Sequence, residues 1–246
     1  MSNRDSAAAC AAPTSEPGAM SSSRGGLFLS FEGGEGTGKT TQIRLLAERL
    51  EALGRRTLVT REPGGTALGE AIRELLVRET EDPPVPLAEL LLYAADRAHH
   101  VARVLRPALE AGLVVLCDRY ADATEAYQGQ GRCLAEETVR MTNALATDGL
   151  WPDRTLLLDL DPSEGVRRAL EREAPAANRP SAEARFEAET MEFHRIVRAG
   201  YRAVAAREPA RVRMVDASGL PEQVAARVWE AVEDLFAMTE RGSRVA

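Results

Sequence analysis

The sequence predicts a three-layer α/β fold in which a five-stranded parallel sheet is flanked by helices. Short apolar runs alternate with longer segments of helical spacing from residue 27 to about residue 240. One run, Leu-Val-Val-Leu-Cys at residues 113–117, is apolar throughout, which is typical of a strand buried on both faces of a parallel sheet. A glycine-rich stretch directly follows the first apolar run, at the end of a strand where α/β folds bind ligands.

Composition and charge narrow the class of protein. A chain of 246 residues, 44% of them hydrophobic, can bury the core of one domain. The net charge of −7 argues against a general binder of nucleic acids or membrane surfaces, because both need a basic field. No stretch approaches ~18 consecutive apolar residues, so we expect no membrane span. The cysteines, Cys10, Cys117 and Cys133, are scattered without metal spacing, which favours a reduced cytoplasmic protein.

The first 26 residues are predicted to form a disordered tail. They are rich in Ala, Ser, Pro and Gly and show no apolar periodicity. Met20 is a candidate for the true start, and a transit peptide is a weaker alternative because only Arg4 and Arg24 are positively charged. We expect one domain over residues 27–240 and a short C-terminal tail at 241–246.

Residues 27–32 (Leu-Phe-Leu-Ser-Phe-Glu) are predicted to form the first strand, and a phosphate-binding loop follows. Gly33 to Thr40 fits the pattern G-x-x-x-x-G-K-[ST] at every fixed position. The glycines can turn their backbone N–H groups onto one anion, Lys39 adds a mobile charge, and the Thr40 hydroxyl suits Mg²⁺. The predicted cofactor-binding positions are Gly33, Gly34, Glu35, Gly36, Thr37, Gly38, Lys39, Thr40 and Thr41.

Lys39 is also the only lysine in the chain, since every other basic side chain is arginine. A compact ammonium can shift between phosphate oxygens in a way that a planar guanidinium cannot. This exception to the composition supports a phosphate-binding role for the loop.

The second predicted strand ends in another turn motif. A helix at residues 41–53 is stopped by Gly54, and residues 56–60 form the strand. The sequence Arg61-Glu62-Pro63-Gly64-Gly65-Thr66 then combines a rigid proline with two permissive glycines. We expect a ligand-binding turn, with an ordinary strand-to-helix turn as the alternative.

A long helix is predicted at residues 87–109, after a helix at 67–77 and a proline-rich break at 81–86. Tyr93 and Arg97 are spaced i, i+4 and therefore share one face. An aromatic plane beside a guanidinium could hold a nucleobase by stacking and hydrogen bonds. Taken alone, the pair is more typical of a half-buried tyrosine beside a surface arginine.

The third predicted strand, residues 113–117, ends in Asp118-Arg119-Tyr120. A carboxylate and a guanidinium at this end of a central strand lie where Mg²⁺ and phosphates are expected, although a structural salt bridge is the alternative. The following segment, residues 121–132, adds polar and aromatic side chains beside this position, namely Thr124, Tyr127, Gln128 and Arg132.

The rest of the chain completes the sheet. Strands are predicted at residues 154–160 and 212–216, and helices at 136–150, from Pro162, at 188–207 and at 221–238. Residues 167–185 hold five arginines among Ala, Pro and Glu, which fits a mobile flap over phosphates. A solvated charged helix is the alternative.

In order and approximate spacing, these motifs are similar to those of thymidylate kinases, and the likeness runs from about residue 27 to the C-terminus. The motifs are the phosphate loop after Phe31-Glu32, Arg61-Glu62-Pro63-Gly64-Gly65-Thr66, Leu92-Tyr93-Ala94-Ala95-Asp96-Arg97, Asp118-Arg119-Tyr120 and Ala126-Tyr127-Gln128-Gly129. The resemblance implies a P-loop NTPase fold with a small arginine-rich lid at about 167–185. It also implies a cytoplasmic homodimer that uses ATP and Mg²⁺ to convert dTMP to dTDP in dTTP biosynthesis.

The resemblance further implies a role for each site residue. Lys39 and Thr40 would handle the ATP phosphates and Mg²⁺, and Asp118 would place the metal directly or through water. Glu35 resembles the bacterial subtype in which this carboxylate touches the 3′-hydroxyl and the flap supplies an arginine. The implied catalytic residues are Lys39, Glu35, Arg119 and Arg185, and the implied metal ligands are Thr40 and Asp118.

On the acceptor side, the resemblance places Arg61, Arg97 and Arg119 around the monophosphate and base, with Arg119 on the phosphate. Tyr93 would stack on thymine, Thr124 would bond the pyrimidine edge, and Tyr127 would crowd the 2′ position and so favour deoxyribose. The implied substrate-binding residues are Arg61, Tyr93, Arg97, Arg119, Thr124, Tyr127 and Gln128.

The chain departs from the family pattern at two positions. Ala184-Arg185-Phe186-Glu187 lacks the acid that commonly precedes this arginine, and Ala123 replaces a common serine. A kinase for another nucleoside monophosphate, or a broader pyrimidine kinase, is one alternative function. A nucleotide-dependent binding module or ATPase subunit is another, although it would have no use for the acceptor-side residues.

Overall fold

The structure is a computed structural model, and it describes residues 25–78, 80–173, 184–187 and 189–242. Nearly all of the expected N-terminal tail, residues 174–183 of the expected lid, and residues 243–246 lie outside the described residues. The first described element is a strand that begins at Leu27, and the last is a helix that ends at Gly242.

Five parallel strands form one sheet in the order β2-β3-β1-β4-β5. The strands are β1 (Leu27–Glu32), β2 (Thr57–Arg61), β3 (Val114–Asp118), β4 (Arg154–Asp159) and β5 (Val212–Asp216). All five lie within one or two residues of their predicted bounds. In the register, Asp118 lies opposite both Phe31 and Arg61. The carboxyl ends of the three strands β2, β3 and β1 therefore meet at one edge of the sheet.

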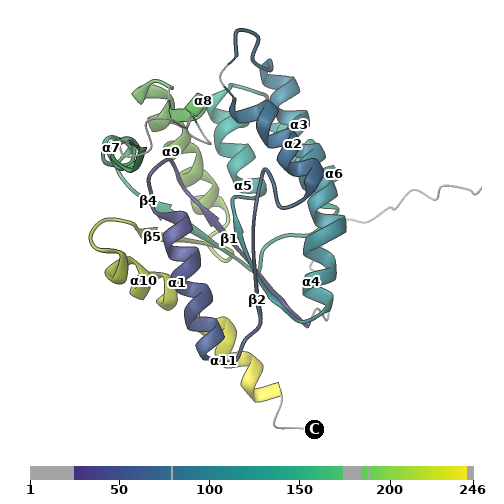
Figure 1. Cartoon of the computed structure of the whole chain (residues 1–246), viewed down its shortest axis with the longest axis vertical. Helices are drawn as coiled ribbons and strands as arrows, with labels where there is room; N and C mark the ends of the chain where they lie inside the picture. The colour runs from purple at the N-terminus through teal and green to yellow at the C-terminus, as the bar shows by residue number, and fades with distance from the viewer. Residues whose placement is uncertain (1–24, 79, 174–183, 188, 243–246) are drawn as a thin grey trace, which may run out of the picture.

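Helices flank the sheet on both faces, which confirms the predicted three-layer α/β fold (Figure 1). Helices α1, α10 and α11 pack on one face, while η1, α4, α5 and α9 pack on the other. The helices are α1 (Lys39–Ala52), α2 (Ala67–Val77), α3 (Pro86–His100), the π-helix η1 (Val101–Leu105), α4 (Arg106–Glu110), α5 (Ala121–Thr124), the π-helix η2 (Glu125–Gly131), α6 (Glu136–Thr147), α7 (Pro162–Glu173), α8 (Ala184–Glu187), α9 (Met191–Arg207), α10 (Pro221–Glu230) and α11 (Glu233–Gly242).

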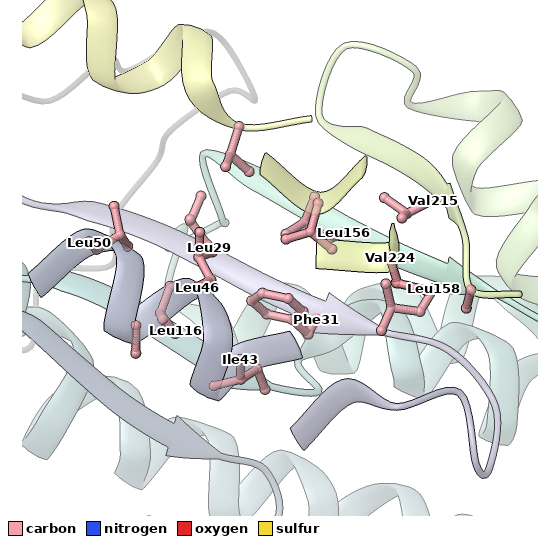
Figure 2. Close-up of a cluster of buried hydrophobic side chains, with 14 of the residues drawn as sticks. Leu29, Phe31, Ile43, Leu46, Leu50, Leu116, Leu156, Leu158, Val215 and Val224 are labelled. Carbon is pink, nitrogen blue, oxygen red and sulfur yellow. The ribbon is translucent and has the colours of Figure 1, made fainter. Parts of the chain in front are cut away.

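The core between β1 and α1 holds the phosphate loop in place. Leu29 and Phe31 of β1 are fully buried and face Ile43 and Leu46 of α1 (Figure 2). Burial of a side chain of this size contributes roughly 1.5–3 kcal/mol. Strand and helix are therefore fixed to each other, and the loop that connects them can move little.

The segment 121–131 is helical, although we predicted no helix there. Gly129 and Gly131 lower the helix propensity of this segment in the sequence, while in the structure Gly131 permits a close helix contact. A Cβ atom at Gly131 would lie 2.8 Å from a ring carbon of Phe193, and one at Gly200 would lie 3.1 Å from the Ala126 Cα. Helices η2 and α9 thus approach each other closely, and η2 is held against the sheet.

Most of the remaining helices agree with prediction, but the closing helix predicted at residues 221–238 is two helices, α10 and α11, separated by a turn at residues 231–232. The expected long helix at residues 87–109 is the continuous run of α3, η1 and α4. Gly54 has a φ of 73° directly after α1, as a glycine that ends a helix should. None of the helices among the described residues combines the length and the apolar character that crossing a bilayer requires.

Candidate functional site

The glycine-rich loop between β1 and α1 has the geometry of an anion cradle. Gly36 and Gly38 have φ values of 65° and 89°, which side chains with a Cβ rarely adopt, and α1 begins at Lys39. The Lys39 ammonium folds back over the loop and donates to the carbonyl oxygens of Gly33 at 3.2 Å and Gly34 at 3.0 Å. The helix dipole and this ammonium both favour negative charge in the cradle.

Helix α7 packs directly against this loop. A Cβ atom at Gly165, in the first turn of α7, would lie 2.3 Å from the carbonyl oxygen of Glu35. A Cβ atom at Gly36 would lie 1.9 Å from the carbonyl oxygen of Gly165. Only glycine fits on either side of this contact, so α7 fixes the back of the loop.

Two oxygen-bearing side chains lie beside the cradle. The Thr40 hydroxyl donates to Asp118 Oδ2 at 3.3 Å. Hydroxyl and carboxylate oxygens are ligands that suit Mg²⁺, which usually completes its coordination with waters and substrate phosphates. Among the described residues, no three His, Cys, Asp or Glu side chains converge as a metal cluster. The Thr40 hydroxyl and the Asp118 carboxylate are of the kind that binds Mg²⁺ together with substrate phosphates.

A cavity lies next to the loop. Glu35 of the loop borders it, so cradle and cavity are contiguous. The other lining residues come from the ends of β2 and β3 and from α2, α3, α5, η2 and α8. They are Glu62, Pro63, Arg73, Val77, Tyr93, Arg97, Arg119, Tyr120, Ala123, Thr124, Tyr127, Gln128 and Phe186.

Tyr93 and Arg97 of α3 both line this cavity, which confirms that they share one face. Tyr93 is half-buried, but Arg97 is only 1% exposed. The Arg97 guanidinium donates to Glu62 Oε2 at 2.8 Å, to Asn143 Oδ1 at 2.8 Å and to the Tyr120 carbonyl oxygen at 3.2 Å. The alternative of a surface arginine is therefore wrong, and three protein groups hold this guanidinium.

The Glu62 carboxylate that binds Arg97 belongs to a buried hydrogen-bond network with His100 and Thr60. The Glu62 carboxylate bonds to His100 Nδ1 at 2.9 Å, and His100 Nε2 bonds to the Thr60 hydroxyl at 2.7 Å. Asp96 accepts a hydrogen bond from the Gly64 backbone N–H at 3.2 Å. Burial, with the nearby charge of Glu62, raises the pKa of Asp96 to about 7. The network ties α3 to the turn after β2.

Arg119 and Glu35 form the junction between cradle and cavity. The Arg119 guanidinium donates to Glu35 Oε1 at 2.9 Å and to the Gly33 carbonyl oxygen at 3.0 Å. The Tyr127 hydroxyl donates to the same Glu35 oxygen at 2.7 Å. Arg119 has a φ of 68°, which turns the chain away from β3 at this point. A positive charge is thus held where a phosphate at the cradle and one in the cavity would meet.

Beneath this junction lies the buried carboxyl group of Glu32, the last residue of β1. It accepts from the Tyr120 backbone N–H at 2.7 Å and from the Tyr201 hydroxyl at 2.9 Å. Burial is the largest cause that raises the pKa of Glu32, to about 8, and the charge of Asp122 adds to it.

Two further predicted residues present polar groups to the cavity. Thr124 is buried, and its hydroxyl has no hydrogen-bond partner among the described residues. A buried polar atom without a partner is rare, and a ligand in the cavity would satisfy it. Gln128 also lines the cavity, and its amide nitrogen donates to Glu89 Oε1 at 2.6 Å.

Two predicted residues lie elsewhere. Arg61 is half exposed, pairs with Glu70 at 2.9 Å, and borders a separate groove beside Thr40 and Asp118 rather than the cavity. Arg185 is paired with Glu89 at 2.5 Å and donates to the Leu76 carbonyl oxygen at 2.9 Å. A direct contact of either arginine with substrate stays a prediction.

Arg73, Glu62 and Phe186 are among the lining residues that the sequence analysis did not assign to the site. Arg73 of α2 donates to the Pro63 carbonyl oxygen at 3.2 Å, Glu62 holds Arg97, and Phe186 packs edge-on against Tyr127. Glu62 belongs to the motif at residues 61–66, and Phe186 directly follows the predicted Arg185, so the sequence offered a signal for both residues. Arg73 had no signal beyond being a charged residue on an amphipathic helix.

Comparison with known proteins agrees with this geometry. The family model described as "Thymidylate kinase" matches residues 31–228. A thymidylate kinase of Synechococcus sp. strain JA-2-3B'a(2-13) is 53% identical over 216 residues, which cover 88% of this chain and 98% of the relative. A thymidylate kinase of Solidesulfovibrio magneticus is 53% identical over 210 residues, which cover 85% of this chain and all of the relative.

A solved structure gives the same result at the level of the fold. The crystal structure of thymidylate kinase from Ehrlichia chaffeensis superposes with a TM-score of 0.68 at 31% identity, and the match covers 84% of this chain and 98% of that one. The family match over residues 31–228 includes the glycine-rich loop, the residues that line the cavity and the strands β2 to β5. We conclude that this chain belongs to the thymidylate kinase family.

Proposed function

We propose that this protein transfers the γ-phosphoryl group of ATP to dTMP, giving dTDP and ADP, and so serves dTTP biosynthesis. One observation carries the proposal: the phosphate cradle and the acceptor cavity are contiguous, and Glu35 and Arg119 form their junction. Two bound phosphates would approach each other at that point. The relatives that share most of their length with this chain are thymidylate kinases.

Alignment and neutralisation of charge would account for the catalysis. The acceptor oxygen of dTMP is already anionic, so no general base is needed. Lys39 lies over the cradle and Arg119 at the junction, where each would stabilise charge that develops during transfer. Thr40 and Asp118 would hold Mg²⁺, which supplies further positive charge to the nucleotide phosphates. Arg185 is retained as a predicted contributor from the lid.

The cavity offers matching groups for a deoxythymidine nucleotide. Tyr93 provides an aromatic face, and the Thr124 hydroxyl and the Gln128 amide provide hydrogen bonds for a base edge. Tyr127 and Glu35, which are hydrogen-bonded to each other next to the cradle, would contact the sugar. We add Arg73 to the residues proposed to bind the acceptor, because its guanidinium lines the cavity near the turn after β2.

An acceptor panel tests the proposal. We expect dTMP to give the highest kcat/KM when dTMP, dUMP, CMP and AMP are each assayed with ATP and Mg²⁺. Removal of Mg²⁺ with a chelator should abolish transfer. A higher kcat/KM for CMP or AMP would instead identify another nucleoside monophosphate kinase. ATP hydrolysis that no monophosphate changes would identify a binding module or ATPase.

We also propose that the protein forms a homodimer through α2, α3 and α6. Helix α3 contacts both α2 and α6, and the three helices lie on one side of the molecule (Figure 1). Each carries a pair of exposed large apolar side chains at helical spacing: Leu68 and Leu75, Leu87 and Leu91, and Met141 and Leu145, the last being 81% exposed. Exposed apolar clusters of this kind mark contact surfaces.

Sedimentation equilibrium tests the dimer. We expect a mass near twice that of the chain, and a monomer for Leu91→Glu with an unchanged helical circular dichroism spectrum. The same substitution at Leu170, an exposed leucine on α7, is the control and should leave the mass unchanged. A monomeric wild-type protein at micromolar concentration would contradict the proposal.

The free thiols of Cys117 and Cys133 support the expected cytoplasmic location.

A further inference from the structure

A buried carboxylate on α3, Glu89, lies beside the acceptor cavity and has no part in the reaction proposed above. Its side chain is fully buried. Oε1 accepts from Gln128 Nε2 at 2.6 Å and from Arg132 Nε at 3.4 Å, and Oε2 accepts from Arg185 Nη2 at 2.5 Å. These partners come from η2, from the turn after it and from α8. Glu89 therefore joins three segments along one side of the cavity.

Of the three partners, only Gln128 lines the cavity. A glutamine amide has two ends of nearly the same shape, but its NH₂ donates hydrogen bonds and its oxygen accepts them. Arg132 and Arg185 surround Glu89 with positive charge, so its carboxylate acts only as an acceptor. The reverse orientation of Gln128 would place two acceptor oxygens against each other. Glu89 thus fixes which end of the amide is offered to a ligand, namely the carbonyl oxygen.

We propose that Glu89 is a positioning residue that sets the base specificity of the acceptor cavity through Gln128. The held carbonyl oxygen accepts a hydrogen bond from the N3–H group of a 4-oxo pyrimidine, the class that includes thymine and uracil. Cytosine carries a lone pair at N3, which the same oxygen repels. This inference rests on the proposed function, because it requires a pyrimidine nucleotide in the cavity. The Glu89 carboxylate touches neither substrate nor reacting atoms.

The substitution Glu89→Gln tests this role, because it keeps the shape of the side chain but can pair with either end of the Gln128 amide. The matched acceptors are dUMP and dCMP, which differ only at the edge that Gln128 would read. We expect the ratio of kcat/KM for dUMP to that for dCMP to fall about tenfold, the equivalent of roughly one hydrogen bond. The dTMP to dUMP ratio and the KM for ATP should stay within about twofold.

Arg132→Met is the matched control. It removes a donor from the same Glu89 oxygen, while the Gln128 contact remains. We expect it to preserve the dUMP to dCMP ratio. An equal fall in both variants would assign the effect to packing of the cavity wall and overturn the role of the amide. An unchanged ratio in Glu89→Gln would overturn the proposal as a whole.

Two further points keep the test decisive. If Glu89→Gln does not fold, the double variant Glu89→Gln with Arg185→Gln replaces the ion pair by an amide pair, and the same ratio is measured.

The failure of this inference is also distinct from the failure of the proposed function. A wild-type protein that prefers dUMP to dCMP, combined with a variant that keeps this preference, rejects only Glu89. A wild-type protein that phosphorylates neither dTMP nor dUMP rejects both.

Discussion

At the scale of single residues, Lys39 is the only lysine in the chain, and its ammonium is held by hydrogen bonds over the phosphate loop. Its ammonium contacts two loop carbonyl oxygens, and arginines occupy every other basic position in the chain. We expect Lys39→Ala to lower kcat by about 10²–10³, which is typical for the loss of one positioned donor in an active site. Lys39→Arg should not restore the rate, because a guanidinium is too wide for the loop. Steady-state kinetics with dTMP and ATP would measure both, and turnover retained in Lys39→Ala would refute its role.

Tyr93 is proposed to act on the acceptor alone, because it lines the cavity and does not border the cradle. Loss of a stacked aromatic ring weakens base binding by roughly 1–3 kcal/mol. We therefore expect Tyr93→Ala to raise the KM for dTMP about tenfold or more while the KM for ATP changes less than about twofold. Tyr93→Phe is the control, since it keeps the ring. An equal rise in both KM values would count against stacking on the base.

Glu32 should make the stability of the protein depend on pH. Its pKa is about 8 in the folded protein, against 4.5 for an ordinary glutamate, because burial disfavours the charged form. Between these values the folded protein holds a proton that the unfolded chain releases, so the free energy of unfolding falls as the pH rises. We expect the melting temperature to drop between pH 5 and pH 8.5.

The variant Glu32→Gln cannot titrate at this position, so its melting temperature should drop less over the same range. Glu48→Gln, on the exposed face of α1, is the control and should behave as the wild type does. Identical pH profiles for wild type and Glu32→Gln would show that another group causes the drop.

At the scale of elements, the contact between α7 and the phosphate loop requires a glycine at position 165, which lies outside the loop motif. A Cβ atom at Gly165 would lie 2.3 Å from the Glu35 carbonyl oxygen, so Gly165→Ala must displace one of the two segments. We expect the KM for ATP to rise about tenfold and the melting temperature to fall by several degrees. Gly129→Ala is the control, because the atoms nearest to its added Cβ lie at 3.9–4.0 Å.

The elements themselves were largely predictable, with one instructive exception. Strands buried on both faces have long apolar runs, so β1, β3 and β4 stand out in the sequence. The helix η2 did not, because Gly131 and the glycine before it read as turn residues. The reason for Gly131 lies in another part of the chain, in the approach of Phe193 on α9. Packing partners that are distant in sequence leave no local pattern.

At the scale of the whole molecule, the edge where the strands end explains which site residues were predictable. Motifs at strand ends, such as Asp118-Arg119-Tyr120, lie at this edge in any parallel α/β fold. The direction of each side chain was not predictable, because neighbouring residues at a strand end point to opposite faces. Arg61 thus points to the groove beside α1, while Glu62 points under the cavity. Arg73 enters the cavity from a helix, through an arrangement that only tertiary structure sets.

Because Lys39 is the only lysine and lies over the cradle, chemical labelling of its amine would report whether a nucleotide is bound there. Amine-reactive acylating reagents can modify only one side chain in the whole sequence, apart from the α-amino terminus. That side chain is 8% exposed and lies where a nucleotide would cover it. Mass spectrometry of the peptide that contains Lys39 would then give the fraction of protein molecules with bound nucleotide. The measurement needs no radiolabel, engineered dye or coupled assay.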